Sequence, residues 1–216
     1  KSDITAAGTW YLWTKVTDLA GNETIEPSKE FKVETNKKDL ITLTPNPSDW
    51  TNQDVTVTID YDDTITGDKT ITVSGTEGED YEIIGETEVV IKTNDQTITV
   101  TVTDETGEEI TKEITISNID KIKPVVTLAP NGNNITMPDS GSATIKTTLT
   151  AEDKGGSGLN RLQYAWSTSK DEEPKEEEWK TFENGETVSK QDCKAGTYYL
   201  WTRVTDIAGN RAEDVK

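Results

Sequence analysis

The sequence predicts an all-β protein in which small β-sandwiches follow one another along the chain. Short segments alternate apolar and polar residues with the two-residue period of a half-buried strand, and Gly, Asn and Asp residues separate them. The chain also repeats itself: residues 7–22 read AGTWYLWTKVTDLAGN, residues 195–210 read AGTYYLWTRVTDIAGN, and thirteen of the sixteen positions are identical. A fainter copy, TITVTVTDETG, occupies residues 97–107. Repeats separated by about the length of a small domain indicate an array of similar units.

The repeated segment is predicted to be a late strand of each unit. In the fainter copy Ile98, Val100 and Val102 fall on one face of a strand and threonines fall on the other. When the three copies are aligned on their V-T-D, the inward face also receives Leu12, Thr14 and Val16 from the first copy, and Leu200, Thr202 and Val204 from the last.

A tight turn is predicted to follow this strand in each copy. Gly21 and Gly209 supply the positive φ that such turns need. Asp18, Asp104 and Asp206 are expected to accept hydrogen bonds from the backbone of the following turn through their side chains.

Two further related segments are predicted to be first strands. They read LITLTPNP at residues 40–47 and VVTLAPNG at residues 125–132, and prolines end them because proline cannot donate a hydrogen bond within a sheet. With the alternating segments that follow, each unit has about seven short strands, as in Greek-key β-sandwiches. The linkers at residues 35–39 and 118–124 are short, so we expect a rod with limited bending.

These segments divide the chain into three predicted parts. Residues 1–36 are the last strands of a truncated domain, residues 37–119 are a complete domain, and residues 120–216 are a domain that lacks its full last strand. The same pattern predicts that the sequence is cut from a longer polymer of two-domain repeats, with residue 189 corresponding to residue 1. The expected partners are therefore neighbouring copies of the same repeat, either in the same chain or head to tail in a fibre.

The composition argues against several classes of function. The formal net charge of −19 opposes binding to nucleic acids and to anionic membrane surfaces, and no apolar run is long enough to insert into a membrane. The chain contains no histidine, which removes the usual general base and the His-dependent catalytic and metal sites. Cys193 is the single cysteine, so the sequence offers no internal disulfide or CxxC motif. We expect a protein that is not an enzyme.

Several longer motifs resemble one known family. They are NIDKxKP at residues 118–124, WTNxDVTVT at 50–58, AEDxxGSGLxxLxYxWS at 151–167 and GTYYLWTRVTDIAGN at 196–210. Together they resemble the immunoglobulin-like repeats of bacterial surface proteins and adhesins, especially those of Gram-positive bacteria. The resemblance implies tandem immunoglobulin-like Greek-key β-sandwiches, an extracellular location at the bacterial cell surface, and a structural role as a stalk or fibre segment. Some such modules bind ligands, so a module that binds a host glycan or protein is the alternative.

The strongest candidate ligand-binding residues are Tyr199, Trp201 and Arg203. They fall on the outward face of the late strand, where exposed aromatic rings could stack on a sugar or contact a protein. The alternative is that they pack beneath the acidic loop at residues 171–179, with Arg203 forming a cation–π pair with Trp201. Tyr164 and Trp166 are expected in the core.

Calcium is the one cofactor that the sequence leaves open. Three acidic clusters at loop ends could supply oxygen ligands, namely Asp60, Asp62 and Asp63, residues 77–80, and Glu152 with Asp153. None has the DxDxDG spacing of a dedicated calcium loop. Solvated carboxylates in a turn are the alternative interpretation.

Overall fold

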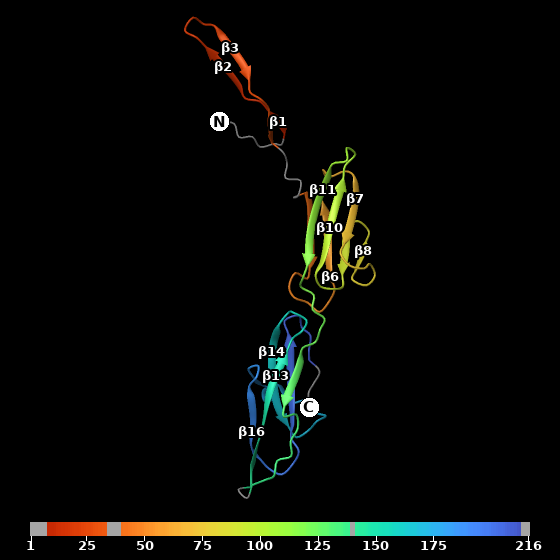
Figure 1. The fold of residues 1–216 in the computed structure, drawn as a ribbon, viewed down its shortest axis with the longest axis vertical. Helices are drawn as coiled ribbons and strands as arrows, with labels where there is room; N and C mark the ends of the chain where they lie inside the picture. The colour runs from red at the N-terminus through yellow and green to blue at the C-terminus, as the bar shows by residue number, and fades with distance from the viewer. Residues whose placement is uncertain (1–7, 34–39, 139–140, 213–216) are drawn as a thin grey trace.

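The computed structural model describes residues 8–33, 40–138 and 141–212 of the 216-residue chain. These residues form the predicted all-β structure, with three parts arranged one after another along its long axis (Figure 1). The predicted linker at residues 35–39 and any strand after residue 212 lie outside the described residues. Within the described part, no helix has the length and apolar character needed to cross a bilayer.

The first part, residues 8–33, is a ribbon of two successive antiparallel strand pairs that we call the N-terminal hairpin. Its strands are β1 (Gly8–Trp10), β2 (Trp13–Thr17), β3 (Glu23–Pro27) and β4 (Phe31–Val33). β2 pairs with β3 and β1 pairs with β4, both antiparallel. Apart from the partly buried Ser28, every residue of the hairpin is exposed, so it does not form an extra layer on the part that follows.

The second part, residues 40–117, is a β-sandwich-like body that we call the first sandwich. Its strands are β5 (Ile41–Asn46), β6 (Val55–Tyr61), β7 (Asp68–Val73), β8 (Tyr81–Ile84), β9 (Glu88–Ile91), β10 (Gln96–Thr103) and β11 (Glu109–Ile116). One sheet has the order β5-β6-β9-β8 and the other the order β11-β10-β7. Apolar side chains from both sheets meet in one buried core.

The alternation predicted for the late strand of this body is confirmed. Ile98, Val100 and Val102 of β10 are buried in the core. The threonines between them face outward and bond across the sheet, for example Thr97 to Thr115, whose hydroxyl oxygens lie 2.9 Å apart. One strand therefore has an apolar face and a hydrogen-bonding face, as the period of two requires.

The third part, residues 125–212, is the second sandwich. Its elements are β12 (Val125–Ala129), β13 (Ala143–Glu152), β14 (Leu159–Ser167), the short 3-10 helix η2 (Glu176–Glu178), β15 (Lys180–Thr181), β16 (Thr187–Cys193) and β17 (Tyr199–Asp206). The sheets β12-β13-β16 and β15-β14-β17 enclose a second core that contains Leu149, Leu200 and Val204. Tyr164 and Trp166 are partly buried against this core, in agreement with their predicted place.

The turn after the repeated strand has the same form in all three copies. Gly21, Gly107 and Gly209 have φ values of 88°, 83° and 92°, which is the left-handed region that glycine enters at little cost. Asp18 Oδ1 accepts a hydrogen bond from Asn22 N at 2.9 Å, and Asp206 Oδ1 accepts one from Asn210 N at 2.8 Å. The turn role predicted for these aspartates is confirmed, including that of Asp104, whose Oδ1 accepts bonds from two backbone N–H groups.

Candidate functional site at the joint between the two sandwiches

The predicted ligand residues Tyr199, Trp201 and Arg203 lie on the outer face of β17, away from the second core. Trp201 is only 3% exposed, because it packs with Ala165 and Trp179 in a small separate cluster. Its Nε1 donates a hydrogen bond to Ser169 O at 3.1 Å. The loop after β14 therefore covers Trp201, which corresponds to the packing alternative rather than to an exposed aromatic platform.

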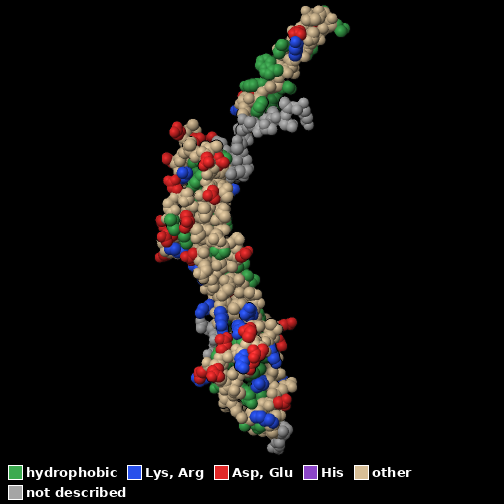
Figure 2. Space-filling view, turned by 180° about the vertical axis from the view of Figure 1, so that it is seen from behind, with side chains coloured by type: hydrophobic (Ala, Val, Ile, Leu, Met, Phe, Trp, Pro, Cys, Tyr) green, Lys and Arg blue, Asp and Glu red, His purple; other side chains and the backbone are tan. Residues whose placement is uncertain are grey.

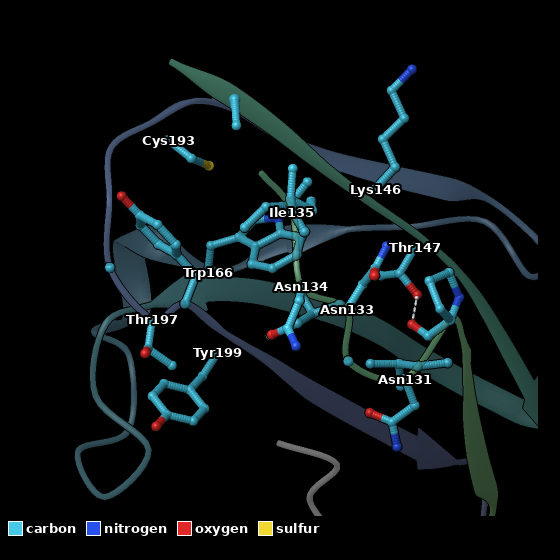
Figure 3. A pocket seen from close by; sticks show the side chains of 18 of the residues that line it. Asn131, Asn133, Asn134, Ile135, Lys146, Thr147, Trp166, Cys193, Thr197 and Tyr199 are labelled. Carbon is cyan, nitrogen blue, oxygen red and sulfur yellow. Dashed lines mark hydrogen bonds between the residues drawn. The ribbon is translucent and has the colours of Figure 1, made fainter. Parts of the chain in front are cut away.

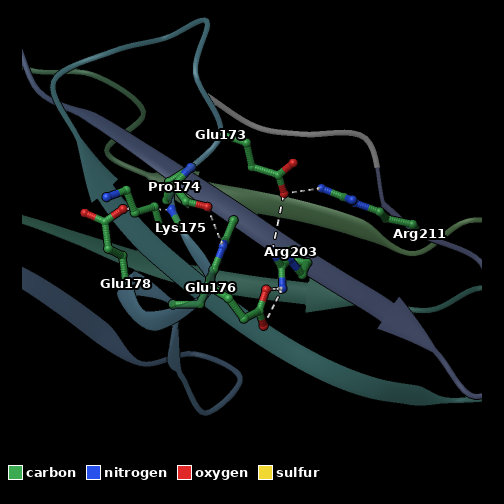
Figure 4. A network of polar contacts seen from close by, with 8 residues as sticks. Glu173, Pro174, Lys175, Glu176, Glu178, Arg203 and Arg211 are labelled. Atoms are coloured by element: carbon green, nitrogen blue, oxygen red, sulfur yellow. Dashed lines mark hydrogen bonds and ion pairs between the residues drawn. The ribbon is translucent and has the colours of Figure 1, made fainter.

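Arg203 is fixed by the same acidic loop (Figure 4). Its guanidinium carbon lies 4.2 Å from the ring centroid of Trp179, a cation–π contact that the sequence analysis, which paired Arg203 with Trp201, did not include. Arg203 Nη1 donates to both carboxylate oxygens of Glu176, at 3.0 and 2.9 Å, and Nη2 lies 3.4 Å from Glu173 Oε1. Burial lowers the pKa of Arg203, but the bonds and charges of the two glutamates outweigh it, so the pKa is raised overall.

The predicted calcium ligands Asp60, Asp62 and Asp63 are exposed at the end of β6. Asp62 Oδ1 accepts hydrogen bonds from the hydroxyl of Thr64 at 2.5 Å and from its backbone N–H at 2.9 Å. These two bonds, with the hydroxyl bond the stronger influence, lower the pKa of Asp62. Asp62 thus matches the alternative interpretation, a solvated carboxylate that supports a turn.

A different acidic group is assembled in the structure, from Asp120, Asp153 and Asp206. Each offers one carboxylate oxygen to a cluster in which these atoms lie within 4.8 Å of one another. Asp120 comes from the linker, Asp153 from the loop after β13, and Asp206 from the end of β17. Asp120 and Asp206 are buried and Asp153 is partly buried.

Each of the six carboxylate oxygens of these three aspartates accepts a hydrogen bond from a donor in the protein. Asp120 accepts from Ser157 Oγ at 2.5 Å and N at 3.1 Å, and from Ile122 N at 2.9 Å. Asp153 accepts from the backbone of Gly155 and Gly158 at 2.9 and 2.6 Å.

The third carboxylate connects the repeated turn to the linker. Asn210 donates to Asp206 from both N and Nδ2, at 2.8 and 2.7 Å, and the same Nδ2 lies 2.8 Å from Asp120 O. Carboxylate oxygens at this spacing could also contact a single hard cation, because an oxygen that accepts one hydrogen bond retains a further lone pair. The cluster acts as a set of acceptors that fixes the linker on the second sandwich.

Gly155 is required at this point for a steric reason. A Cβ atom at residue 155 would lie 1.7 Å from Asp120 Oδ1, far inside van der Waals contact. The backbone of Gly155 therefore packs directly on the linker carboxylate, and no other residue fits there without displacing it.

The same linker is held by the first sandwich. Ile119 is buried in the first core, and its N–H donates to Asn94 Oδ1 at 3.0 Å. Asp120 N donates to Thr51 O at 2.8 Å. Lys121 Nζ bonds to Lys92 O at 2.7 Å and forms an ion pair with Asp54 at 2.5 Å.

Residues 118–122, which we call the joint, thus have partners on both bodies. Asn118 adds bonds from its Nδ2 to Asp49 O at 2.7 Å and Pro47 O at 3.2 Å. Because side chains and backbone of one short segment are bonded on both sides, the two sandwiches are coupled through a structured connection rather than a loose tether.

A cavity of about 530 Å³ opens at the other end of the second sandwich (Figure 3). The loop after β12 contributes Asn131, Asn133 and Asn134, and the sheet contributes Trp166 and Tyr199. Trp166 Nε1 is shielded from solvent and has no hydrogen-bond partner among the described residues. Tyr199 is the only one of the three predicted ligand residues that lines this cavity.

Comparison with known proteins adds no assignment to these sites. No protein-family model matches the chain, and no curated protein matches it significantly.

Sequence reasoning placed Asp120, Asp153 and Asp206 in three separate motifs but missed that they meet. The available signal was that Asp153 and Asp206 each precede a glycine-containing turn, whereas nothing beside Asp120 in the sequence marks it. Their convergence depends on strand pairing within the second sandwich, which places Val125 beside Glu152 and Leu159 beside Asp206, and no local pattern expresses that pairing.

Proposed function

We propose that the chain is a structural stalk or fibre segment of a bacterial surface adhesin, built from tandem immunoglobulin-like repeats, and that it has no catalytic role. The joint is the observation that carries this proposal. Its residues are bonded to both bodies, and a spacer must resist bending at its junctions if it is to hold a distal part away from a surface.

The strand order supports the immunoglobulin-like part of the proposal. In chain order the first sandwich places strands one, two, five and four in one sheet and strands seven, six and three in the other. This is the arrangement of a seven-stranded constant-type immunoglobulin domain. Acidic side chains gather along one edge of the first sandwich in Figure 2, and the net charge of −19 suits tandem domains that stay soluble and separate.

Small-angle X-ray scattering on the full chain tests the spacer role. We expect a radius of gyration well above the ~17 Å of a compact 216-residue protein. The double variant Asp120→Ala/Asn210→Ala removes acceptors and donors of the joint and should broaden the distribution of molecular lengths. Lys170→Ala, at an exposed ion pair remote from the joint, is the matched control. A compact wild-type particle would contradict the proposal.

The surface location needs a separate test. Antibodies raised against the full chain should label intact cells of the source bacterium, since the proposal places the segment outside the cell. Labelling only after permeabilisation would contradict an extracellular location while leaving the scattering result intact.

A second candidate function is binding of a glycan or another uncharged polar ligand in the cavity of the second sandwich. The unpartnered Nε1 of Trp166 favours it, because a buried N–H without an acceptor costs free energy that a ligand oxygen would recover. Asparagine amides and the ring of Tyr199 provide the accompanying polar and stacking groups.

Glycan-array screening of the full chain, followed by titration of any ligand found, tests this candidate. Tyr199→Ala and Trp166→Phe should each weaken binding, the second because it removes the N–H while retaining an aromatic ring. Trp201→Phe, beneath the acidic loop, should leave binding unchanged. The absence of binding across the array, or equal effects of all three variants, would exclude a site in this cavity.

A further inference from the structure

The N-terminal hairpin exposes residues that the second sandwich buries at corresponding positions. Leu12 is 60% exposed and its counterpart Leu200 is 5% exposed. On the opposite face of the strand, Trp13 is 64% exposed and Trp201 is 3% exposed. The later strand is therefore packed against other residues on both faces, whereas both faces of the nearly identical strand in the hairpin are exposed to solvent. Extended apolar exposure of this kind marks an interaction surface.

The open edge of the hairpin is equally informative. β17 is bonded on both sides, to β14 along one edge and, at Thr205, to Arg211 along the other. Thr17 and Glu23 of the hairpin correspond to Thr205 and Arg211 at the 188-residue offset, and they pair in the same way. β3 therefore already occupies the second edge of β2. The edge of β2 that has no strand among the described residues is the one that β14 fills in the second sandwich.

We infer that the N-terminal hairpin is a docking element whose occupant is a second copy of the half-sandwich formed by residues 119–188. This segment contains β12–β15 and the acidic loop, which are the elements that cover β17. The inference rests on the proposed function, because it needs the tandem repetition of the same unit. Strand addition at an open edge, with side-chain pockets on both faces, is an established physical mode of recognition.

The positions at which the two copies differ keep the chemistry of this contact. The differing pairs are Trp10 with Tyr198, Lys15 with Arg203 and Leu19 with Ile207. Arg203 lies between Glu173 and Glu176 of the acidic loop, and Lys15 presents a positive charge for the same pair of glutamates.

The turn of the hairpin also matches the joint of a second copy. Asn22 Nδ2 donates to Asp18 Oδ2 at 2.8 Å, as Asn210 Nδ2 donates to Asp206 Oδ2 at 2.7 Å. In the second sandwich that same nitrogen also donates to Asp120 O. The half-sandwich brings an equivalent Asp120 carbonyl, so Asn22 acquires the same second acceptor.

The test is a lengthened full chain in which a second copy of residues 119–188 directly precedes Lys1. Residue 189 corresponds to residue 1 at the 188-residue offset, so the added copy ends at Val188. Amide hydrogen exchange at residues 12–16 should slow by at least about 100-fold relative to the original chain, because β2 becomes a central strand of a closed sandwich.

Two matched chains control for specificity. In the first, Val16→Asp is added to the lengthened chain, which should then lose the new protection. The original chain should tolerate the same change, because Val16 is exposed there. In the second, residues 37–94 of the first sandwich replace the added copy and should not protect residues 12–16. Unchanged exchange in the lengthened chain, or equal protection by residues 37–94, would overturn the inference, and the scattering result for the joint would stand in either case.

Discussion

Residues 8–22 and residues 196–210 are almost the same peptide in two surroundings. Both form a strand that ends in an aspartate-bonded turn with glycine at positive φ. Val204 of the later copy is buried in a core, whereas Val16 of the earlier copy lies at the surface. The comparison teaches that this sequence encodes its strand and turn locally, while its burial depends on distant strands, which among the described residues cover only the later copy.

The comparison also separates two sources of stability. The turn costs little to form because its hydrogen bonds join residues four apart or fewer. Burial of the strand needs β14 and the acidic loop, which lie about 20 to 50 residues before β17 in the chain, so its free energy appears only when the whole sandwich closes. Paired substitutions at corresponding positions of the two copies can measure each contribution.

The largest difference is expected for Leu200→Ala against Leu12→Ala. Leu200 is part of the second core, so truncating it should lower the free energy of unfolding of the second sandwich by about 2–5 kcal/mol. Leu12 has no cover, and the same change there should stay within about 0.5 kcal/mol. Urea denaturation of the full chains measures both values, and similar losses at the two positions would break the comparison.

The next difference is expected for Asp206→Ala against Asp18→Ala. Loss of the buried Asp206 carboxylate leaves two Asn210 donors without that acceptor, at a cost of about 2–3 kcal/mol to the second sandwich. Relief of repulsion from Asp120 and Asp153 offsets part of this cost.

Asp18→Ala should leave the unfolding transitions of both sandwiches in place, because the hairpin turn is exposed and lies outside them. Differential scanning calorimetry of the two variants distinguishes these outcomes. If Asp18→Ala shifted a sandwich transition as much as Asp206→Ala, the hairpin would have to be part of that sandwich.

A smaller difference is expected for Arg203→Ala against Lys15→Ala. Arg203 has a well-covered side chain, lies on the ring of Trp179 and bonds to Glu176, so its removal should destabilise the second sandwich by about 1–2 kcal/mol. Lys15 pairs with Glu23 at the surface and should contribute no more than about 0.5 kcal/mol. Urea denaturation followed by tryptophan fluorescence measures the change, and an unaltered midpoint for Arg203→Ala would contradict the structural role assigned to this residue.

The smallest effect is a titration within the hairpin. The side-chain and backbone hydrogen bonds from Asn22 lower the pKa of Asp18 below its ordinary value of 3.8. Since the pKa is depressed in the folded turn, the carboxylate supports the turn above pH 3.8, and this support is lost as the pH falls through the lowered value. An NMR titration should show the depressed pKa in the full chain and its return towards 3.8 in Asn22→Ala; an unchanged value in that variant would show that the turn is not formed as described.

The strands and turns were largely accessible from the sequence because they depend on short-range patterns. The segment at residues 159–167 matches β14, and the alternation of Ile98, Val100 and Val102 gave the inward face of β10 correctly. The aspartate-bonded turns also followed from residue type and spacing. These features require no knowledge of which strands become neighbours.

The sites were less accessible because they depend on contacts between distant segments. Trp201 was assigned to the outer face of its strand, but whether that face is open depends on the loop that carries Trp179. Of the acidic clusters singled out in the sequence, Asp60, Asp62 and Asp63 remain at the surface, whereas Asp153 meets Asp120 and Asp206, which lie 86 residues apart in the chain. Proximity along the chain was therefore a poor guide to proximity in space.

The central claim is that one sequence forms the same strand and turn with cover in the second sandwich and without cover in the hairpin. Residue-resolved hydrogen exchange on the unmodified full chain tests it most directly by comparing the amides of residues 12–16 with those of residues 200–204. We predict that residues 200–204 exchange only through unfolding of the second sandwich, while residues 12–16 exchange several orders of magnitude faster, since a two-stranded ribbon alone is marginally stable. Equal protection of the two segments would contradict the account.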